Sequence, residues 1–263
     1  MNKHLYLFTV GFFYAHSLVA QVNHGARLTA MGNNGAAVKD IWGVAVNPAA
    51  IAYISSPMIQ ITQQEHFFTN EIRNQALVVA IPFKNLVFGL GLQRYGISAF
   101  QNNKVGIVIT KAFGPKLAIG LRANYNQLKI SNYGATVGIS VDLGTIYQLT
   151  DELCLGFYIN NLTKEAYRTK TIHTSLPTAA YFGIAYRTSD KLLIASTISK
   201  GVVATGIDYQ LIKAFSIRSG LSLNPFTHYF GLGFNPLKFL IDFAFTKHPN
   251  FGYSPQLTIG YVF

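Results

Sequence analysis

The sequence predicts an all-β protein, a 14-stranded antiparallel transmembrane β-barrel with an N-terminal plug segment. The chain of 263 residues is half hydrophobic and only 12% charged. After residue 20 it nevertheless lacks the run of about 18 uninterrupted apolar residues that a spanning helix needs. From Pro57 onward it divides into short segments separated by turn residues, and its last segment alternates apolar and polar residues up to Phe263. Because only helices and closed barrels satisfy every backbone group in lipid, these features indicate a barrel.

The first twenty residues predict export. A short basic start that contains Lys3 precedes an apolar stretch at residues 5–14, and small residues around Ala20 form a cleavage site. This pattern is typical of a secretory signal peptide, and it is too short for a membrane anchor. The predicted division of the chain is a signal peptide at residues 1–20, an N-terminal periplasmic plug at residues 21–56 and an outer-membrane β-barrel at residues 57–263.

The barrel segments are each close to the 9–11 residues that cross a bilayer when tilted. An even number of strands places both termini on the periplasmic side, where short turns alternate with longer outer loops. All eight prolines after Ala50 fall at predicted strand ends or in loops, where no ladder hydrogen bond is lost. The predicted strands are 57–67, 71–82, 85–95, 103–113, 116–129, 134–149, 152–162, 178–188, 190–200, 202–212, 214–224, 227–235, 237–247 and 255–263.

The last strand places Leu257, Ile259, Tyr261 and Phe263 on one face. An edge strand of a soluble sandwich is the alternative, but a terminal Phe ordinarily frays into water. In a barrel these aromatic residues lie in the interfacial girdle. Tyr261 and Phe263 also resemble the terminal recognition signal of Gram-negative outer-membrane proteins, so they are the predicted barrel signal.

Charged residues on the polar faces of the strands predict ion pairs inside the barrel. Arg122 and Asp142 lie ten residues on either side of Asn132, and Asp208 and Arg218 lie five residues on either side of Lys213. A charged constriction in a pore is one interpretation. Structural pairing is the interpretation that we favour, because a buried charge without a partner is strongly destabilising.

Two further residues are expected to face the lumen. Asp242 alternates with lipid-facing aromatic residues, and we expect it to point inward toward Tyr229. Cys154 is the only cysteine, so it forms no internal disulfide, and we interpret it as a small packing residue rather than a reactive thiol.

The net charge of +11 falls to +10 when Lys3 leaves with the signal peptide. Nucleic acid is excluded as a partner because no Lys or Arg run and no basic helix is present. The expected partners of this charge are the phosphates of outer-membrane lipid and lipopolysaccharide. Lys164, Arg168 and Lys170 share the longest predicted outer loop. Contact with lipopolysaccharide and docking of a partner protein both remain open for that loop.

No catalytic residues are predicted. The chain has no Gly-x-Ser-x-Gly elbow and no phosphate-binding loop, and its histidines lack metal-ligand spacing. His173 and Ser175 share a loop with Glu165 but are two residues apart, a spacing unlike that of a catalytic triad. We therefore expect a protein that is not an enzyme, with no cofactor and no metal.

Residues 21–56 are rich in Gly and Ala and read as a compact element that packs closely against other backbone. An Asp in a short run of small residues (Asp40) and a turn at Asn47, Pro48 and Ala49 lead into the first strand. This motif resembles the long-chain fatty-acid transporter (FadL) superfamily, and within it the compact PorV/PorQ-like barrels of the Bacteroidota. The resemblance implies an integral outer-membrane barrel with its N-terminus tucked inside.

That superfamily includes transporters of hydrophobic substrates and partners in protein complexes that do not transport. The predicted lumen is filled with paired charges, and the outer loops are too short for a ligand groove. We therefore expect an accessory subunit of an outer-membrane complex for protein export, barrel assembly or surface display, with other outer-membrane proteins or surface lipoproteins as partners. The alternative is a FadL-like diffusion channel for hydrophobic small molecules.

Overall fold

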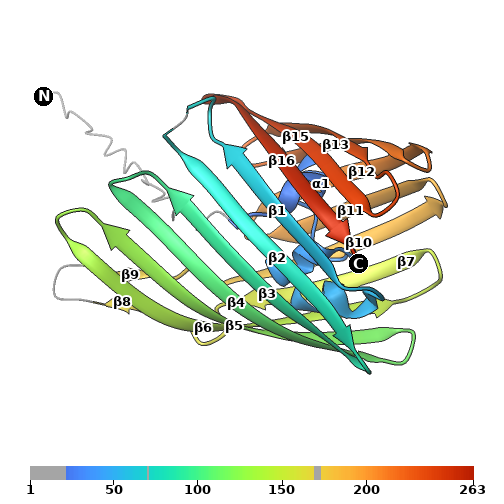
Figure 1. The fold of residues 1–263 in the computed structure, drawn as a ribbon, viewed down its shortest axis with the longest axis horizontal. Coiled ribbons are helices and arrows are strands. Elements are labelled where there is room, and N and C mark those ends of the chain that lie inside the picture. Colours follow the sequence, from blue (N-terminus) through green and yellow to red (C-terminus); the bar gives the residue numbers. More distant parts are fainter. Residues whose placement is uncertain (1–21, 70, 169–172) are drawn as a thin grey trace, which may run out of the picture.

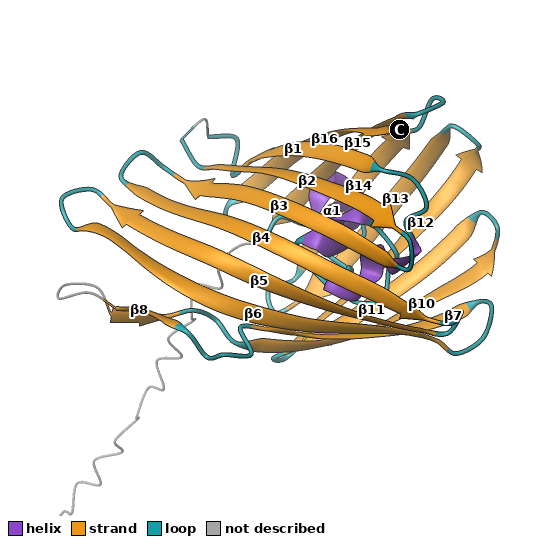
Figure 2. Ribbon diagram, turned by 60° about the horizontal axis from the view of Figure 1, so that its bottom comes forward, coloured by secondary structure: helices purple, strands orange, loops and turns teal. Residues whose placement is uncertain are grey.

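The computed structural model describes residues 22–69, 71–168 and 173–263. In this part of the chain, antiparallel strands close into a 14-stranded barrel around three short N-terminal helices (Figures 1 and 2). The predicted fold class is confirmed. The predicted signal peptide lies outside the described residues, and the boundary between plug and barrel stays a prediction.

The barrel strands occupy nearly the predicted segments. They are β1 (Met58–Glu65), β2 (Arg73–Phe83), β3 (Leu86–Gly96), β4 (Phe100–Phe113), β5 (Leu117–Ile130), β6 (Gly134–Gln148), β7 (Leu153–Asn160), β10 (Ala179–Ser189), β11 (Leu192–Ser199), β12 (Val202–Ile212), β13 (Phe215–Leu223), β14 (Thr227–Phe234), β15 (Phe239–His248) and β16 (Gly252–Val262).

Neighbours in the barrel follow chain order, with one exception. β7 pairs with β10, because β8 (Ala166–Arg168) and β9 (His173–Ser175) form a separate two-stranded hairpin. β1 closes the barrel against β16 in a register that places Ile61 opposite Ile259.

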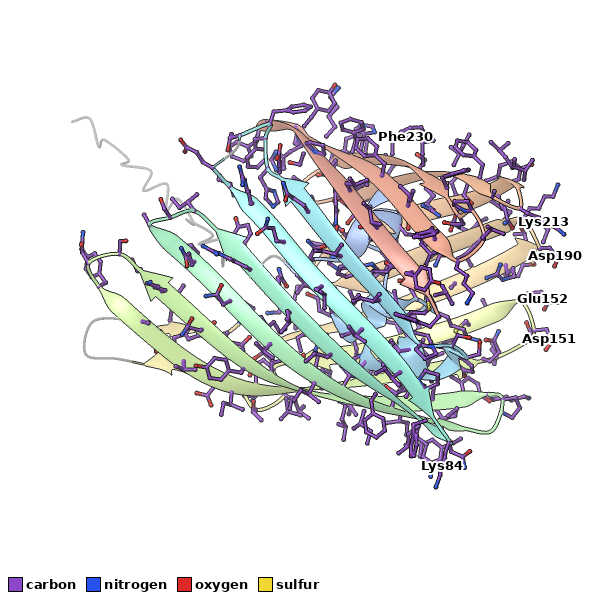
Figure 3. The ribbon with its side chains drawn as sticks, viewed as in Figure 1. Lys84, Asp151, Glu152, Asp190, Lys213 and Phe230 are labelled. Carbon is purple, nitrogen blue, oxygen red and sulfur yellow. The ribbon has the colours of Figure 1, made fainter. Side chains whose placement is uncertain are left out.

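Alternation along each strand separates an apolar outer surface from the lumen. Ile107 and Ile139 are 63% and 65% exposed on the outside, whereas Arg122 and Asn124 are buried inside. Apolar side chains cover the outer wall between the charged turns (Figure 3). This is the distribution expected of a barrel in lipid. In the described residues, no helix has the length and hydropathy to cross a membrane.

The two ends of the barrel differ. The short-turn end carries the C-terminus and tight turns such as those at Lys84, Lys213 and Asp190 (Figure 3). The loop end carries residues 66–69, 71 and 72 and the hairpin of β8 and β9. The long outer loops expected between the predicted strands at residues 96–102 and 248–254 are wrong. β4 begins at Phe100 and β16 at Gly252, so only tight turns remain there.

Two prolines that were predicted at strand ends lie inside strands. Pro82 is opposite Val87 in the β2–β3 ladder, and Pro255 is opposite Phe245 in the β15–β16 ladder. Both are within a few residues of the end of the strand. The missing N–H of proline is tolerated there more readily than at the centre of a strand.

β6 is longer than its neighbour β7. It pairs with β7 only over Leu143–Gln148, so its loop-end half has no strand on one side. The chain after β7 covers part of this edge, and the backbone N–H of Leu162 donates to the carbonyl oxygen of Val141 at 2.7 Å. We call residues 161–168 and 173–178 the hairpin segment.

Candidate functional site: the plugged lumen

The lumen contains three short helices and the loops that join them, residues 25–53, which we call the plug. The helices are α1 (Gly25–Ala30), η1 (Ile41–Val44) and η2 (Pro48–Tyr53). The residues of the predicted motif begin two of them. The Asp40 side chain accepts from the Trp42 N–H at 2.8 Å and caps η1, and the Asn47 side chain accepts from the Ala49 N–H at 3.1 Å and caps η2. Pro48 occupies the first position of η2, where no N–H is needed.

Glycines on the barrel wall let the plug backbone approach closely. A Cβ atom on Gly144 would lie 2.0 Å from the Asn47 side chain, and one on Gly156 would lie 1.9 Å from the Ala36 carbonyl oxygen. No real Cβ tolerates such distances, so a side chain at these positions would displace the plug. We call the following residues the glycine belt: Gly89, Gly120, Gly144, Gly156, Gly183, Gly206, Gly220 and Gly231.

The glycine belt occupies eight strands around the barrel, β3, β5, β6, β7, β10, β12, β13 and β14. The plug is therefore fitted against most of the wall. In this conformation the plug fills the middle of the lumen, and a solute on the barrel axis meets it.

The centre of the lumen is apolar. Leu28, Trp42 and Ile51 of the plug pack with Val78 and Ile146 of the wall in one buried cluster, to which Cys154 also belongs. The expectation of a lumen filled with paired charges is therefore incomplete. It rested on the polar positions alone and overlooked strands such as β2, whose lumen-facing residues include Ala76, Val78 and Ala80.

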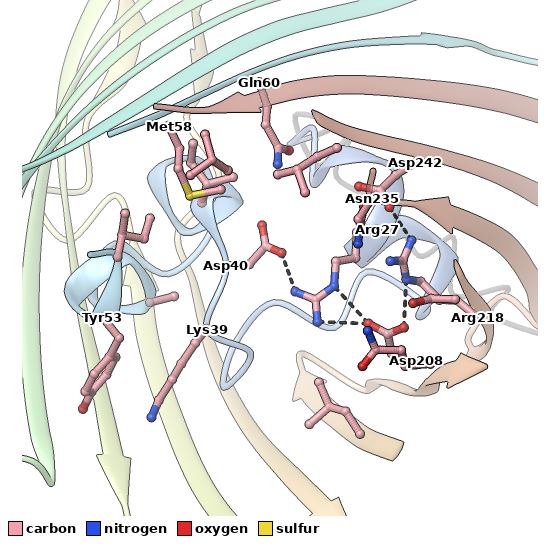
Figure 4. Close-up of a pocket in the computed structure, with 18 of the residues that line it drawn as sticks. Arg27, Lys39, Asp40, Tyr53, Met58, Gln60, Asp208, Arg218, Asn235 and Asp242 are labelled. Carbon is pink, nitrogen blue, oxygen red and sulfur yellow. Dashed lines mark hydrogen bonds and ion pairs between the residues drawn. The ribbon is translucent and has the colours of Figure 1, made fainter. Parts of the chain in front are cut away.

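Charged residues form one network at the short-turn end (Figure 4). Arg27 of α1 lies 2.6 Å from Asp40 and 3.0 Å from Asp208, and Arg218 bridges Asp208 at 3.0 Å and Asp242 at 2.5 Å. Burial alone would lower the pKa of the Arg27 guanidinium, but Asp208 and Asp40 raise it above its ordinary value. The network borders a cavity of about 450 Å³ that opens at this end.

Two features of this network were not anticipated from the sequence. Asp242 contacts Arg218 rather than Tyr229, whose hydroxyl contacts Ser222 instead. Arg27 links the plug to the wall, and no spacing in the sequence relates it to Asp208. The sequence offered one signal of a further cation. Three carboxylates were predicted to face inward, but only two arginines were predicted to pair with them.

A second ion pair lies on the loop side of the plug. Arg122 and Asp142 are opposite each other on β5 and β6, are almost fully buried and approach to 2.6 Å. Arg122 also donates to the Val44 carbonyl oxygen of the plug at 2.7 Å. Asp142 accepts from the Asn124 amide at 2.7 Å and from the backbone N–H of Asn161 at 2.6 Å. The pair therefore connects the plug, the wall and the hairpin segment.

Asn161 organises the hairpin segment. Its side-chain amide donates to the carbonyl oxygens of Glu165 and Leu176, and its side-chain oxygen accepts from the Glu165 N–H. Tyr167 and Leu176 pack against Leu128 of the wall. The pKa of the Tyr167 phenol is raised to about 12, because burial disfavours the phenolate.

Only part of the predicted contact loop lies within the described residues. Lys164 is exposed, the side chain of Arg168 is not described, and Lys170 lies outside the described residues. At the C-terminus, Tyr261 makes an edge-on contact with Phe239 at 5.2 Å between ring centroids. Phe263 is exposed, and its N–H donates to the Pro57 carbonyl oxygen at 3.0 Å.

Two small cavities meet on the loop side of the plug. One, of about 60 Å³, is bordered by Tyr95, Asn160 and Leu176 among others. The second, of about 20 Å³, is mainly apolar and lies between Val44 of the plug and the β2–β5 wall. Gln93 and Lys104 border both cavities.

No protein-family model and no curated protein matches the chain. Solved barrel structures do match it. The monoaromatic hydrocarbon channel CymD has a TM-score of 0.74 at 14% identity, covering 94% of this chain and 99% of CymD. The Pseudomonas putida toluene transporter TodX has a TM-score of 0.70 at 13% identity, covering 94% and 98%. A Pseudomonas aeruginosa FadL homologue has a TM-score of 0.64 at 11% identity, covering 90% and 98%.

These likenesses show the fold, a FadL-type barrel. They also correct the expected function. The accessory-subunit role is wrong, because the chains that share the fold over nearly their whole length are a hydrocarbon channel and a toluene transporter. The error came from the premise that charges fill the lumen, because the centre of the lumen is a buried apolar cluster.

Proposed function

We propose that this chain is an outer-membrane channel through which hydrophobic small molecules diffuse. The observation that carries the proposal is the shared fold, which extends over nearly the full length of both this chain and hydrocarbon channels or transporters. A barrel with an apolar exterior and an internal plug suits a passive conduit in the outer membrane of a Gram-negative bacterium. Nothing in the proposal requires an enzymatic step or a cofactor.

The apolar centre of the lumen supports a hydrophobic solute. Val44, Val78 and Ala76 border the small cavity beside the plug, and the buried cluster continues from them toward the short-turn end. A hydrophobic molecule that enters from the loop end therefore meets apolar side chains along the β2–β4 wall. A sugar or an ion would lose much of its hydration along the apolar part of this wall.

Passage along this wall requires the plug to move. The cavity beside Val44 holds about 20 Å³, less than any hydrocarbon solute occupies, and Gly89 of the wall contacts Val44. η1 is attached by few polar contacts, including the hydrogen bond from Arg122 to Val44 and that from Trp42 to Gln60. We therefore propose that a displacement of η1 widens this cavity into the transport path.

Within this class of barrels, the motif at Asp40, Asn47, Pro48 and Ala49 supports a place in the PorV/PorQ-like branch of the Bacteroidota. The positive net charge of the chain supports contact with the phosphates of lipid and lipopolysaccharide. Both points are part of the proposal.

Uptake by intact cells tests the proposed function. The full chain, with its signal peptide, is produced in a Gram-negative host that has complete lipopolysaccharide and lacks its own hydrocarbon channels. We expect the initial uptake rate of radiolabelled toluene to rise several-fold above the empty-vector rate, while uptake of a disaccharide stays unchanged. Toluene uptake at the vector rate, with the barrel shown to be in the outer membrane, contradicts the proposal.

A further inference from the structure

The wall formed by β3, β4 and β5 is long at the loop end. β4 and β5 have 14 residues each, whereas β11 and β13 on the opposite side of the barrel have eight and nine. The hairpins that join β3 to β4 and β5 to β6 project past the turn between β1 and β2 (Figure 1). This wall therefore has an outer surface beyond the level at which shorter strands end.

The outward side chains of this wall change from apolar to polar within two residues along each strand. One outward row, exposed on the outside of the barrel, consists of Leu92, Val105 and Tyr125. The next outward row consists of Gln75, Arg94, Asn103 and Gln127, and Lys129 follows Gln127 one outward position later on β5. We call Gln75, Arg94, Asn103, Gln127 and Lys129 the polar wall.

The opposite wall stays apolar up to its last paired outward row. That row crosses β10, β11, β12 and β13, and its members are Phe182, Ile198, Val203 and Leu223. All four are exposed. The polar wall is therefore a feature of one side of the barrel rather than a belt around its whole rim.

The two cations of the polar wall have no carboxylate to pair with. β3, β4 and β5 contain no Asp or Glu. Within residues 22–69, 71–168 and 173–263, the side chains of Arg94 and Lys129 make no ion pair and no hydrogen bond. Arg73 on β2 is not counted with them, because Glu65 lies opposite it and Glu71 precedes it by two residues. Arg94 and Lys129 thus give this outer surface an excess of positive charge.

The amides of the polar wall can bind hydroxyl groups. The Asn103 side chain donates to Oε1 of Gln127 at 3.1 Å. In the described part of the chain this contact leaves the NH₂ group of Gln127 as a donor and Oδ1 of Asn103 as an acceptor. A guanidinium such as that of Arg94 binds a phosphate with two parallel hydrogen bonds. Phosphate and sugar hydroxyls together are the groups that this set of side chains matches.

The position of the polar wall identifies the leaflet that it meets. An even number of strands places the short-turn end, with the C-terminus, in the periplasm, so the loop end faces the outside. The outer leaflet of a Gram-negative outer membrane is made of lipopolysaccharide, in which acyl chains, sugars and phosphates follow one another. The apolar row at Leu92, Val105 and Tyr125 matches the acyl chains, and the cations beside it match the phosphates.

We propose that the polar wall is a binding site for one lipopolysaccharide molecule on the outside of β3, β4 and β5. Arg94 and Lys129 contact its phosphates, and Asn103 and Gln127 contact its sugars. The proposal rests on the proposed function for the outer-membrane location and for contact with lipopolysaccharide, and it assigns that contact to one side of the barrel. Transport through the lumen is not needed for this binding.

Native mass spectrometry of the purified full chain tests this site. Deep-rough lipopolysaccharide is titrated into nonionic detergent micelles, and the lipid-bound fraction of the barrel gives the Kd. We compare wild type with the double variant Arg94→Gln/Lys129→Gln. The matched control is Lys111→Gln/Lys213→Gln, which removes the same charge from exposed lysines near the short-turn end.

Folding is checked separately from binding. Without lipopolysaccharide, Arg94 and Lys129 have no partner to lose, so both double variants should remain folded barrels. Heat-modified migration in gels establishes this for each variant.

We expect Arg94→Gln/Lys129→Gln to weaken lipopolysaccharide binding by about tenfold or more, the effect of losing charge-assisted contacts. The control should stay within about threefold of wild type. Wild type should bind the same lipopolysaccharide about tenfold more weakly after its phosphates are removed. Equal binding by Arg94→Gln/Lys129→Gln and wild type overturns the site, and equal weakening in the control variant overturns it in favour of nonspecific attraction.

Phosphatidylglycerol separates lipopolysaccharide from other sources of phosphate. If phosphatidylglycerol displaces lipopolysaccharide from wild type at equal concentration, lipopolysaccharide is not the specific occupant. The outcome is also independent of transport. The expected lipopolysaccharide binding without toluene uptake would contradict the proposed channel alone. Toluene uptake, with wild-type lipopolysaccharide binding by Arg94→Gln/Lys129→Gln, would contradict the polar-wall site alone.

Discussion

The guanidinium of Arg122, on the barrel wall, donates a 2.7 Å hydrogen bond to the carbonyl oxygen of Val44, on the plug. The same guanidinium holds Asp142, which accepts from the first residue of the hairpin segment, Asn161. One buried arginine therefore contacts the plug directly and the loop end through a single carboxylate.

Removal of Arg122 should destabilise the barrel. Arg122→Met leaves Asp142 buried without its cation, and we expect the free energy of unfolding to fall by about 3–5 kcal/mol. Urea unfolding in detergent micelles measures it. Arg94→Met is the control, because Arg94 is exposed on β3. In Arg122→Met/Asp142→Leu both charges are gone, and the loss should be smaller than in Arg122→Met. A double variant less stable than the single variant would contradict the pairing.

A side chain on the glycine belt should displace the plug. Gly144→Val places a Cβ 2.0 Å from the Asn47 side chain, so the turn before η2 must move. We expect Gly144→Val to show ion conductance in planar bilayers and faster proteolysis near residues 45–50, relative to wild type. Leu143→Val, one residue away on the opposite face, should behave as wild type. Equal conductance and equal cleavage for both variants would show that the plug is not seated against the belt.

His66 should make the barrel less stable in acid. Burial lowers the pKa of His66 from 6.5 to about 4, because the charged form loses its hydration. Between these values the unfolded chain binds more protons than the folded chain. The contribution of neutral His66 to the free energy of unfolding is therefore fully present above pH 6.5. It falls as the pH decreases toward 4, by at most about 3 kcal/mol.

His66→Phe keeps a ring against Tyr95 and has no proton to bind. The difference in unfolding free energy between wild type and His66→Phe should therefore change with pH in this window and be constant above it. Thermal or urea unfolding from pH 4 to pH 8 measures the difference. A difference that does not vary with pH would contradict a buried, neutral His66.

Asn161 should control the hairpin segment through its side chain and its backbone. It has a positive φ of 52°, which glycine adopts freely and alanine does not. Asn161→Gly removes the hydrogen bonds to Glu165 and Leu176 and keeps the backbone relaxed, whereas Asn161→Ala also adds strain. We expect cleavage within residues 161–178 to accelerate in the order wild type, Asn161→Gly, Asn161→Ala. Cleavage of Asn161→Gly at the wild-type rate would assign the role of this residue to the backbone alone.

Much of the barrel could be predicted from the sequence, because a period of two and turn residues specify strands locally. The hairpin symmetry that relates Arg122 to Asp142 is also local, and the ladder places these residues opposite each other. The tight turns before Phe100 and Gly252 were harder, since the strands there continue through polar residues and a proline.

The contacts between plug and wall could not be predicted, because they join segments with no sequence relationship. Arg27 reaches Asp208 across 181 positions, and Ala36 fits against Gly156 only because the plug folds back into the lumen. Scattered glycines in strands indicate close approach of some backbone without identifying it. The apolar packing between plug and wall was missed for the same reason, and with it the argument against a lumen filled by charges.

A reversible lock on the plug tests the central claim most directly. Lys39 of the plug donates to the Gln148 side chain of β6 at 2.6 Å near the short-turn end. Lys39→Cys and Gln148→Cys, in a Cys154→Ser background, can be joined by a short cleavable bismaleimide. The single variant Lys39→Cys, treated identically, is the control. We predict that cross-linked cells take up radiolabelled toluene at the empty-vector rate and regain uptake when the linker is cleaved. Toluene uptake that is above the vector rate and unchanged by the cross-link would contradict a channel opened by the plug.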